Sequence, residues 1–327
     1  MEILEPGEKV DFYGSGERLH RFEETMARTL GHEAAVFMPS GTMAQQIALR
    51  IVADRRDCKR VAFHCTSHLE IHEQGAYREL HGLEAQLLGA ADRLFTLAEL
   101  EALDLPLSTI LWELPQREIG GQLPSWDDLQ AQLEWAAGQG IHRHLDGARL
   151  WEAAPYYERS PGQIAGAFDS MYVSFYKGIG GIAGAVLAGD QSFIEASRVW
   201  LRRHGGNLVS LYPYVLSAEH HYRKRAHCFG DYAKRAASVA RTLGGIDGIT
   251  VVPTQPPTCM MHLHFDAEAD TINERHHALA AEHRVQLFSR AVPLDNGGCK
   301  VELSIGDAIG EISDDELGQW YRLLVSP

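Results

Sequence analysis

Short apolar runs alternate with amphipathic stretches along most of this chain. The apolar runs have the length and residue types of buried strands, and between them apolar residues recur at helical spacing, as at Leu19, Phe22 and Met26. We expect strands at 34–38, 61–64, 109–112, 141–146, 171–175 and 182–188, and helices at 17–30, 42–53, 96–103, 126–138 and 191–203. Strands that alternate with helices predict an α/β fold with a mainly parallel sheet covered on both faces.

The last two of these strands are joined only by a short, glycine-rich turn, Lys-Gly-Ile-Gly-Gly at 177–181. A parallel connection needs a crossover of a dozen or more residues, usually a helix. We therefore expect one antiparallel strand within the otherwise parallel sheet.

The pattern changes after about residue 210. A long helical stretch at 213–243 ends at a pair of glycines, and shorter elements follow it. We expect strands at 249–252, 260–265, 285–288 and 300–304, with helices at 269–283 and from 314. This arrangement predicts a large α/β domain over 1–222 and a small α+β domain over 223–327.

Composition narrows the class of partner. The net charge of −14 argues against nucleic acid or an anionic membrane as the main partner, and no apolar run reaches the ~20 residues that span a bilayer. The N-terminal stretch 1–12 is acidic and lacks the order of a signal peptide. Five scattered cysteines fit reduced thiols. We expect a cytoplasmic protein that acts on a small molecule.

Two residues in 142–190 carry the main chemical prediction. Asp146 ends an apolar strand, and Lys177 lies between an aromatic strand and several glycines. A desolvated lysine amine is a nucleophile toward carbonyls, and a carboxylate is the usual partner of a pyridinium nitrogen. Together they predict pyridoxal 5′-phosphate as the cofactor, with Lys177 as the Schiff-base residue and Asp146 as the partner of the ring nitrogen.

Both residues also have a simpler interpretation. Lys177 has the sequence context of a lysine that extends from a strand end into water, and Asp146 that of a helix N-cap. Arg149 fits capture of a carboxylate or a surface ion pair. The nearby glycines favour the cofactor, because they let the backbone approach a flat ring or a phosphate closely.

Ser40, Gly41 and Thr42 follow a strand and open a helix, a favourable place for a phosphate group. His64, His68 and His72 recur at intervals of four, a spacing that would also suit a metal ion on one helical face. No cysteine or acidic cluster completes a tetrahedral set there, so we expect no metal. Stacking on a cofactor ring is the better use of one of these histidines.

The residues together resemble the family of threonine aldolases and aromatic amino acid β-eliminating lyases, which are fold-type I pyridoxal phosphate enzymes. The similarity covers most of the chain; its specific parts are YGSGERLHRFEETMARTLGHEAAVFMPSGTMAQQIAL (13–49), HLEIHEQGA (68–76), HLDGARLWEA (144–153) and DSMYVSFYKGIGGIAGAVLAG (169–189).

This resemblance implies a role for each matching residue. Lys177 would hold the cofactor covalently, Asp146 would keep its ring nitrogen protonated, and His68 would stack on the ring. Gly41 and Thr42 would bind the phosphate. The resemblance also implies that Arg149 contacts the cofactor's phenolic oxygen or the substrate carboxylate, and that Glu73 and Glu113 lie near the site.

The chain departs from the family at positions that handle the substrate. Tyr176 stands where a serine usually precedes the lysine, and Gln116 where a histidine handles the β-hydroxyl. Glu302 replaces the arginine that grips the substrate carboxylate, and Arg290 is a candidate substitute. The cofactor prediction does not depend on these positions.

We therefore expect an aldolase that cleaves β-hydroxy-α-amino acids such as threonine or allo-threonine to glycine and an aldehyde. His68 or a bound water would act as the base. Two alternatives stay open: a β-eliminating lyase that acts on a different amino acid, and a non-catalytic relative of the fold. The resemblance also implies a homodimer or homotetramer.

Overall fold

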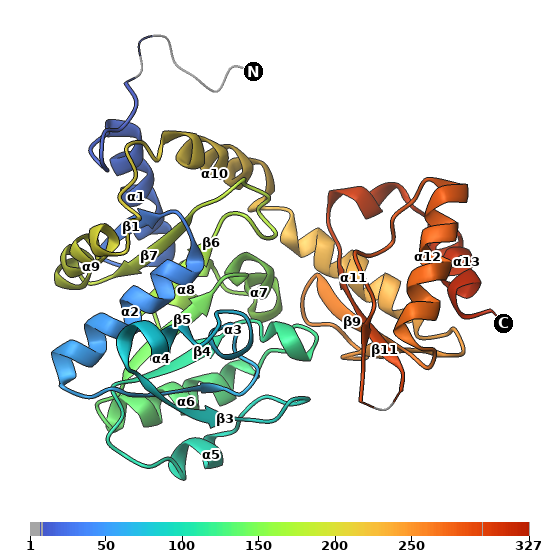
Figure 1. Ribbon diagram of the computed structural model, residues 1–327, viewed down its shortest axis with the longest axis horizontal. Coiled ribbons are helices and arrows are strands. Elements are labelled where there is room, and N and C mark those ends of the chain that lie inside the picture. The colour runs from blue at the N-terminus through green and yellow to red at the C-terminus, as the bar shows by residue number, and fades with distance from the viewer. Residues whose placement is uncertain (1–6, 8, 296, 327) are drawn as a thin grey trace. The chain divides into compact units, whose positions relative to one another are not determined.

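The computed structural model describes residues 7, 9–295 and 297–326 (Figure 1), apart from the side chain of residue 311. Most of the N-terminal stretch that led us to expect no signal peptide lies outside the described residues. The chain divides into two compact units. The larger unit consists of Met1–Pro115 and Leu123–His227, and the smaller unit of Gln116–Gln122 and Cys228–Pro327.

A seven-stranded sheet lies at the centre of the larger unit. Its strands are β1 (Ala34–Met38), β2 (Arg60–His64), β3 (Glu84–Leu88), β4 (Thr109–Glu113), β5 (His142–Gly147), β6 (Ser170–Ser174) and β7 (Ala185–Gly189). They lie in the order β1-β7-β6-β5-β4-β2-β3. Strand β7 is antiparallel to both of its neighbours, and the other neighbouring pairs are parallel. The expected parallel sheet with one antiparallel strand is confirmed.

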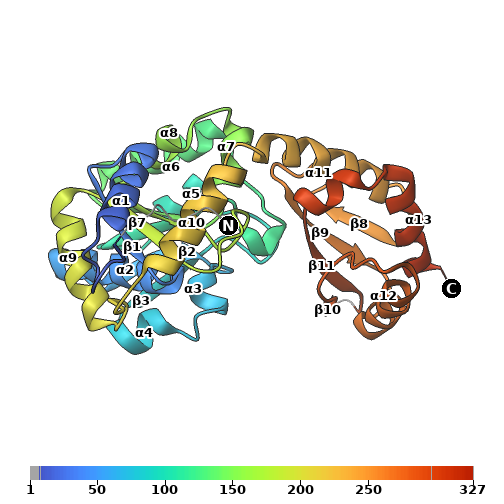
Figure 2. The same cartoon turned by 90° about the horizontal axis from the view of Figure 1, so that it is seen from above.

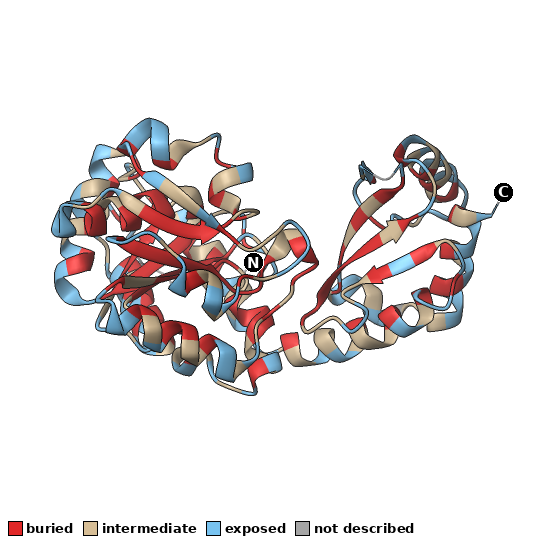
Figure 3. Cartoon of the chain, turned by 90° about the horizontal axis from the view of Figure 1, so that it is seen from below, coloured by how far each residue is buried: buried red, intermediate tan, exposed pale blue. Residues whose placement is uncertain are grey.

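Helices cover both faces of this sheet, so its strands other than the edge strand β3 are mostly buried, while the outer faces of the helices are exposed (Figure 3). The helices of the larger unit are α1 (Glu17–Leu30), α2 (Gly41–Arg56), α3 (His68–Ile71), α4 (Ala76–His81), α5 (Leu97–Glu101), α6 (Trp126–Gly138), α7 (Leu150–Tyr157), α8 (Pro161–Ala165), α9 (Gln191–Arg203) and α10 (Tyr212–Arg225).

Strand β1 shows how alternation assigns side chains to the two faces. Val36 and Met38 belong to a core cluster with residues of α2 and α9. Phe37, which points the other way, lies 6.0 Å from Phe22 of α1, measured between ring centroids. Both faces of this strand are therefore apolar, as the uninterrupted apolar run predicts.

The smaller unit contains a four-stranded antiparallel sheet in the order β10-β11-β9-β8. Its elements are the strands β8 (Ile249–Val252), β9 (Met260–Phe265), β10 (Val292–Pro293) and β11 (Cys299–Ser304), the helices α11 (Phe229–Leu243), α12 (Ala269–His283) and α13 (Asp314–Val325), and the 3₁₀ turns η1 (Arg117–Ile119) and η2 (Asp307–Glu311). Figure 2 shows the three helices beside this sheet. The unit is α+β, as expected.

The structure differs from the expected elements in several places. Strand β3 was not predicted, because polar Glu84 and Gln86 interrupt its apolar pattern at the edge of the sheet. The strand expected at 285–288 is wrong: the N–H of Leu287 donates to Nε2 of His276 at 3.0 Å instead of joining a sheet.

The helix expected at 213–243 is two helices. Helix α10 ends at Arg225 and α11 begins at Phe229. The two units divide in the turn between them, after His227, whereas the sequence placed the division at 222/223. Segment 116–122 joins the smaller unit, which no local pattern in the sequence indicates.

Within the described residues, no helix combines the length and the apolar character needed to cross a membrane.

Candidate active site

The carboxyl group of Asp146 lies near the carboxyl end of β5, with β4 and β6 on either side. Only 1% of the residue's surface is exposed. Its Oδ1 accepts a hydrogen bond from the backbone N–H of Ala148 at 3.0 Å, and its Oδ2 accepts one from Nε2 of Gln45 at 2.6 Å. Burial raises the pKa of Asp146, and the charge of Lys177 is the strongest opposing influence. The carboxyl group is a desolvated acceptor that a nearby cation helps to keep ionised.

Lys177 lies in the loop that joins β6 to β7, and its side chain is half-buried. The loop folds on itself. The N–H of Gly181 donates to the carbonyl of Phe175 at 2.6 Å, and the N–H of Phe175 donates to the carbonyl of Gly184 at 3.0 Å. Strands β5 and β6 are parallel neighbours, so their carboxyl ends lie side by side, and the loop after β6 begins close to Asp146. The predicted lysine and carboxylate therefore both lie at the carboxyl ends of the parallel strands.

Helix α2 begins at the same end of the sheet, after the carboxyl end of β1. Ser40 is its N-cap, and the Ser40 Oγ accepts a hydrogen bond from the N–H of Met43 at 3.3 Å. Gly41 and Thr42 are the first two helical residues. The N–H of Gly41 donates to the hydroxyl of Tyr176 at 3.1 Å. The N-terminus of a helix presents N–H groups and a positive dipole end, which together favour an anion.

Position 41 has room for glycine alone. A Cβ atom there would lie 2.6 Å from Cε2 of Tyr172 and 2.9 Å from the hydroxyl of Tyr176. The glycine thus lets the helix start come into direct contact with two tyrosine side chains from β6 and the loop after it. Tyr176 is partly exposed, but desolvation of its hydroxyl group by the surrounding protein raises its pKa, so the phenol stays protonated near neutral pH.

His68 opens α3 and is linked to two buried acids. Its Nδ1 lies 2.9 Å from Oε1 of Glu73, and its backbone N–H donates to Oε2 of Glu113 at 3.3 Å. The other oxygen of Glu73 accepts a hydrogen bond from Nε2 of Gln46 at 2.7 Å. The charges of His68 and Glu73 both act on Asp146, which places this group beside the carboxyl group of β5.

The two other histidines of the 64–72 series have separate environments. His64 belongs to β2, and its ring nitrogens lie 2.9 Å from Oγ1 of Thr66 and 2.8 Å from the carbonyl of Arg93. His72 is exposed. In the part of the chain that the structure describes, no group of three or more histidine, cysteine or acidic side chains is placed to hold a metal ion.

Arg149 lies at the start of α7, three residues after Asp146. Its side chain is 12% exposed, and its Nε lies 3.7 Å from Oε1 of Glu152, which is buried. A mostly buried guanidinium with a buried acid beside it differs from the surface ion pair that the sequence left open.

The candidate substrate residues Gln116 and Arg290 belong to the smaller unit. Gln116 is buried, and its backbone N–H donates to the carbonyl of Gln122 at 3.0 Å. Arg290 is exposed in the segment before β10. Glu302 is the acid at the family's arginine position. Its Oε2 lies 2.7 Å from Nε of Arg117, so an arginine side chain lies beside this position.

Four polar residues near these groups were missed by sequence reasoning: Gln45, Gln46, Tyr172 and Arg117. The first two carried a signal, because adjacent glutamines in a helix that must pack on an apolar sheet need buried partners. Tyr172 and Arg117 acquire their contacts only through tertiary structure.

These residues fit pyridoxal phosphate. Asp146 offers a buried acceptor for a protonated ring nitrogen, and Lys177 offers an amine. The helix start at 40–42 offers N–H donors to a phosphate. The fit rests on the buried acceptor, the amine and the donors at the helix start.

Comparison with known proteins identifies the family to which the chain is similar. Residues 4–266 match the model of a family described as beta-eliminating lyase. A candidate L-allo-threonine aldolase from Listeria monocytogenes EGD-E has a similar structure, with a TM-score of 0.95 and 45% sequence identity. That similarity covers 99% of this chain and 90% of the Listeria chain.

Two further relatives are informative. A candidate aromatic amino acid beta-eliminating lyase/threonine aldolase from Exiguobacterium sp. 255-15 has a TM-score of 0.93 and 45% identity, over 98% of this chain and 90% of that one. The aldolase vrtJ of Penicillium aethiopicum is 33% identical over 231 residues, which are 68% of this chain but 58% of that protein.

Proposed function

Because this chain belongs to the beta-eliminating lyase family, we propose that it is an aldolase that cleaves β-hydroxy-α-amino acids of the threonine or allo-threonine type to glycine and an aldehyde. Pyridoxal 5′-phosphate is its cofactor. One observation carries the proposal: the buried carboxyl group of Asp146 and the loop that holds Lys177 lie at the carboxyl ends of two neighbouring parallel strands, β5 and β6. The 45% identity to the Listeria protein over nearly the whole chain supports the type of substrate.

Each residue near the sheet edge has a defined task in this proposal. Lys177 holds the cofactor covalently, Asp146 pairs with the ring nitrogen, and His68 stacks on the ring. Ser40, Gly41 and Thr42 bind the phosphate. When bound, the cofactor supplies an electron sink that lets a bond at the substrate Cα break.

His68 is also suited to take the proton from the β-hydroxyl group. The buried carboxylate of Glu73 accepts the Nδ1–H of His68, which leaves Nε2 as the acceptor nitrogen. Glu73 would then stabilise the cationic ring that results from proton uptake. This arrangement replaces the histidine that the family has at the position of Gln116.

Arg149 is our first candidate for the substrate carboxylate, because a guanidinium can bind a carboxylate through two hydrogen bonds. Glu152 lies 3.7 Å from its Nε and orients the side chain. Arg290 and Gln116 are further candidates for substrate binding.

The test is turnover by the purified, cofactor-loaded protein. Glycine should form from threonine, allo-threonine or phenylserine, and Lys177→Ala should abolish it. Lys59→Ala, which removes an exposed lysine, is the matched control and should keep full activity. If the loaded protein forms no glycine from any β-hydroxy amino acid, the proposed aldol cleavage is wrong.

The second candidate reaction is β-elimination, which the description of the relative from Exiguobacterium includes. In that case the same residues would serve loss of a leaving group from Cβ. Formation of pyruvate and ammonia from cysteine or serine, without glycine from threonine, would favour this reaction.

The proposal extends to a cytoplasmic homodimer or homotetramer. The five cysteines, all of which the structure describes, form no disulfide, which is typical of a reducing compartment. Val10, Phe12, Tyr13 and Val209 are exposed apolar residues, and the N–H of Tyr13 donates to the carbonyl of Val209 at 2.9 Å. Apolar side chains gathered in this way are typical of an interface. Light scattering after size-exclusion chromatography should give the molar mass of a dimer or tetramer, and Phe12→Asp should lower this molar mass.

A further inference from the structure

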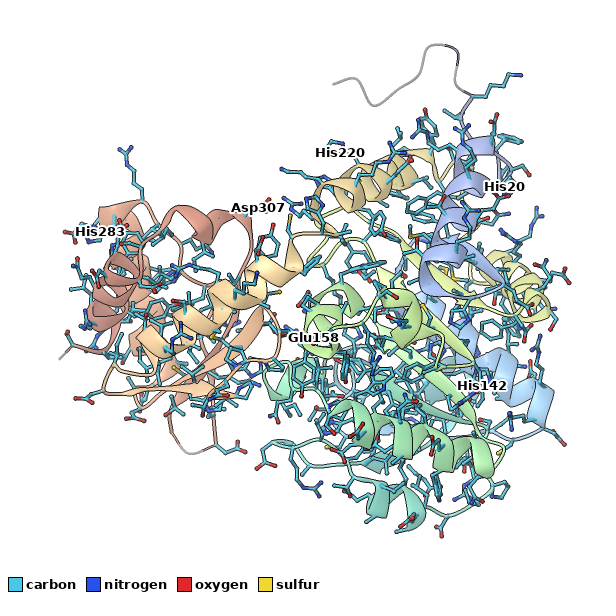
Figure 4. All side chains as sticks on the ribbon, turned by 180° about the vertical axis from the view of Figure 1, so that it is seen from behind. His20, His142, Glu158, His220, His283 and Asp307 are labelled. Carbon is cyan, nitrogen blue, oxygen red and sulfur yellow. The ribbon has the colours of Figure 1, made fainter. Side chains whose placement is uncertain are left out.

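A continuous row of hydrogen bonds leads away from Asp146 through the interior of the larger unit. Nε2 of Gln45 donates to Asp146, and Oε1 of Gln45 lies 2.7 Å from Nε2 of His144. Nδ1 of His144 lies 2.7 Å from Oγ of Ser170, which lies 2.8 Å from Nε2 of His142. We call Gln45, His144, Ser170 and His142 the Gln45 chain; Figure 4 labels its outer end, His142.

The members of the Gln45 chain come from three elements, α2, β5 and β6. Gln45, His144 and Ser170 are each no more than 1% exposed. Polar groups so deeply buried are costly unless every donor meets an acceptor. The sequence shows an alternation of His142 and His144 on β5 but gives no sign that a glutamine of α2 completes it.

Hydrogen-bond chemistry fixes the direction of every bond in the Gln45 chain. An ionised carboxylate only accepts, so Gln45 must turn its N–H₂ group toward Asp146 and its oxygen toward His144. The proton of neutral His144 is then on Nε2, and its Nδ1 accepts from the hydroxyl of Ser170. The oxygen of Ser170 in turn accepts from Nε2–H of His142. All donors therefore point toward Asp146.

Neutral histidines are required for this pattern, and the environment supplies them. Burial lowers the pKa of His144 to about 3 and that of His142 to about 4. The charged or titratable groups that act on Asp146 itself are Lys177, His68 and Glu73, and Tyr172 of β6 is affected by its charge. Burial and the charge of Glu73 oppose ionisation of Asp146, while the charges of Lys177 and His68 favour it.

We propose that Gln45, oriented by His144 and Ser170, is a positioning residue that holds Asp146 ionised and aimed at the ring nitrogen of the cofactor. The Gln45 donor and the Ala148 N–H bind one carboxylate oxygen each, so the carboxyl plane cannot rotate. Hydrogen bonds to an ionised acceptor are stronger than those between neutral groups. This inference rests on the proposed function only in taking Asp146 as the partner of the ring nitrogen.

The test compares two ligands that differ only in that nitrogen: pyridoxal 5′-phosphate and its 1-deaza analogue, in which a C–H replaces the ring nitrogen. Their dissociation constants are measured by fluorescence for the wild type and for Gln45→Leu. The matched control is Gln132→Leu, which places leucine at another buried helical glutamine of the larger unit.

Gln45→Leu should weaken binding of pyridoxal phosphate by about tenfold and leave binding of the deaza analogue unchanged. Gln132→Leu should leave the ratio of the two dissociation constants unchanged. Equal weakening of both ligands by Gln45→Leu would mean a merely structural role and would overturn the inference.

Ser170→Ala acts at a distance, through His144, and should show the same ligand-dependent pattern to a smaller degree. It decides the question by the same criterion if Gln45→Leu fails to fold. Failure of the proposed function gives a different result: wild-type protein would bind both ligands equally or form no glycine, whatever residue stands at position 45.

Discussion

The hydroxyl group of Tyr176 accepts a hydrogen bond from the backbone N–H of Gly41, at 3.1 Å, across 135 positions of sequence. The bond joins the residue before the proposed Schiff-base lysine to the helix start that we propose binds phosphate. A phenol that accepts from this N–H can also donate its own proton to an anion held there. We propose that Tyr176, which stands where a serine usually precedes the lysine in the family, contacts this anion.

Replacement of Tyr176 by phenylalanine tests this relationship. A hydrogen bond to a charged acceptor contributes about 1.5–3 kcal/mol, so Tyr176→Phe should weaken pyridoxal phosphate binding by at least about tenfold. Binding of pyridoxal, which lacks the phosphate, should not change. Tyr156→Phe, at another exposed tyrosine, is the control. Equal losses for both ligands would contradict a contact with phosphate.

Gly41→Ala should damage the same helix start by a steric effect. The new Cβ would overlap the Tyr172 ring, and relief of such overpacking costs about 1–3 kcal/mol. Both the unfolding free energy in urea and the affinity for the cofactor should fall. Gly138→Ala, at the end of α6, has no atom within 4 Å of its new Cβ and should leave both unchanged or raise stability slightly. A Gly41→Ala variant that keeps full affinity would contradict the tight approach.

The sequence predicted six of the seven strands of the larger unit because an apolar run marks each of them, and it predicted the longer helices from their apolar periodicity. It did not predict the short helices α3, α4 and α8. It failed where tertiary contacts decide. Polar Glu84 still joins an edge strand, and the N–H of Leu287 is bound by a histidine side chain. The candidate residues Lys177, Asp146, His68 and 40–42 lie at or next to the ends of regular elements, so local patterns were enough to propose them. Gln45 and Arg117 depend on partners about a hundred or more positions away, which no local pattern contains.

Acid should destabilise the protein below about pH 6.5. Burial is the main cause that lowers the pKa of His81, His142 and His262 to about 4 and that of His144 to about 3. These groups bind protons more readily in the unfolded chain, where their pKa is near 6.5. Stability is therefore complete above pH 6.5 and declines as the pH falls toward 4. Urea unfolding at pH 7, 6 and 5 should give steadily lower midpoints.

His81→Leu should make this decline shallower. Among the described residues, neither ring nitrogen of His81 has a hydrogen-bond partner, so leucine breaks no such bond. Removal of one titrating group reduces the slope by at most about 1.4 kcal/mol per pH unit. His220→Gln, at an exposed histidine, is the control and should leave the slope unchanged. An unaltered slope in His81→Leu would contradict the assignment of a neutral His81.

Glu23 and Arg198 protect the open edge of β1, and their loss should be costly. The carboxylate of Glu23 accepts from the N–H of Phe37 at 2.8 Å, while Nη2 of Arg198 donates to Glu23 at 2.6 Å and to the carbonyl of Ala35 at 3.3 Å. Because Glu23 is buried, its removal leaves the N–H of Phe37 without its acceptor, whereas the half-exposed guanidinium of Arg198 can bind water. Glu23→Ala should lower the unfolding free energy by about 2 kcal/mol.

The matched control for Glu23→Ala is Glu17→Ala. It breaks an exposed ion pair with Arg21 on the same helix and should cost less than about 1 kcal/mol. Urea titrations of the two variants beside the wild type provide the comparison. Similar losses in both variants would show that the edge of β1 gains nothing from Glu23.

The antiparallel position of β7 between β1 and β6 also governs how the protein can be made. The N–H of Gly184 donates to the carbonyl of Pro39 at 3.1 Å, and among the described strands β7 is the one neighbour of β1 in the sheet. A nascent chain therefore carries an unpaired β1 until residues 185–189 have left the ribosome. Early strands that wait for a distant partner are exposed to aggregation and to chaperones. A premature stop before residue 185 should yield no partial enzyme, because helix α2 and its first residues would have no completed sheet on which to pack.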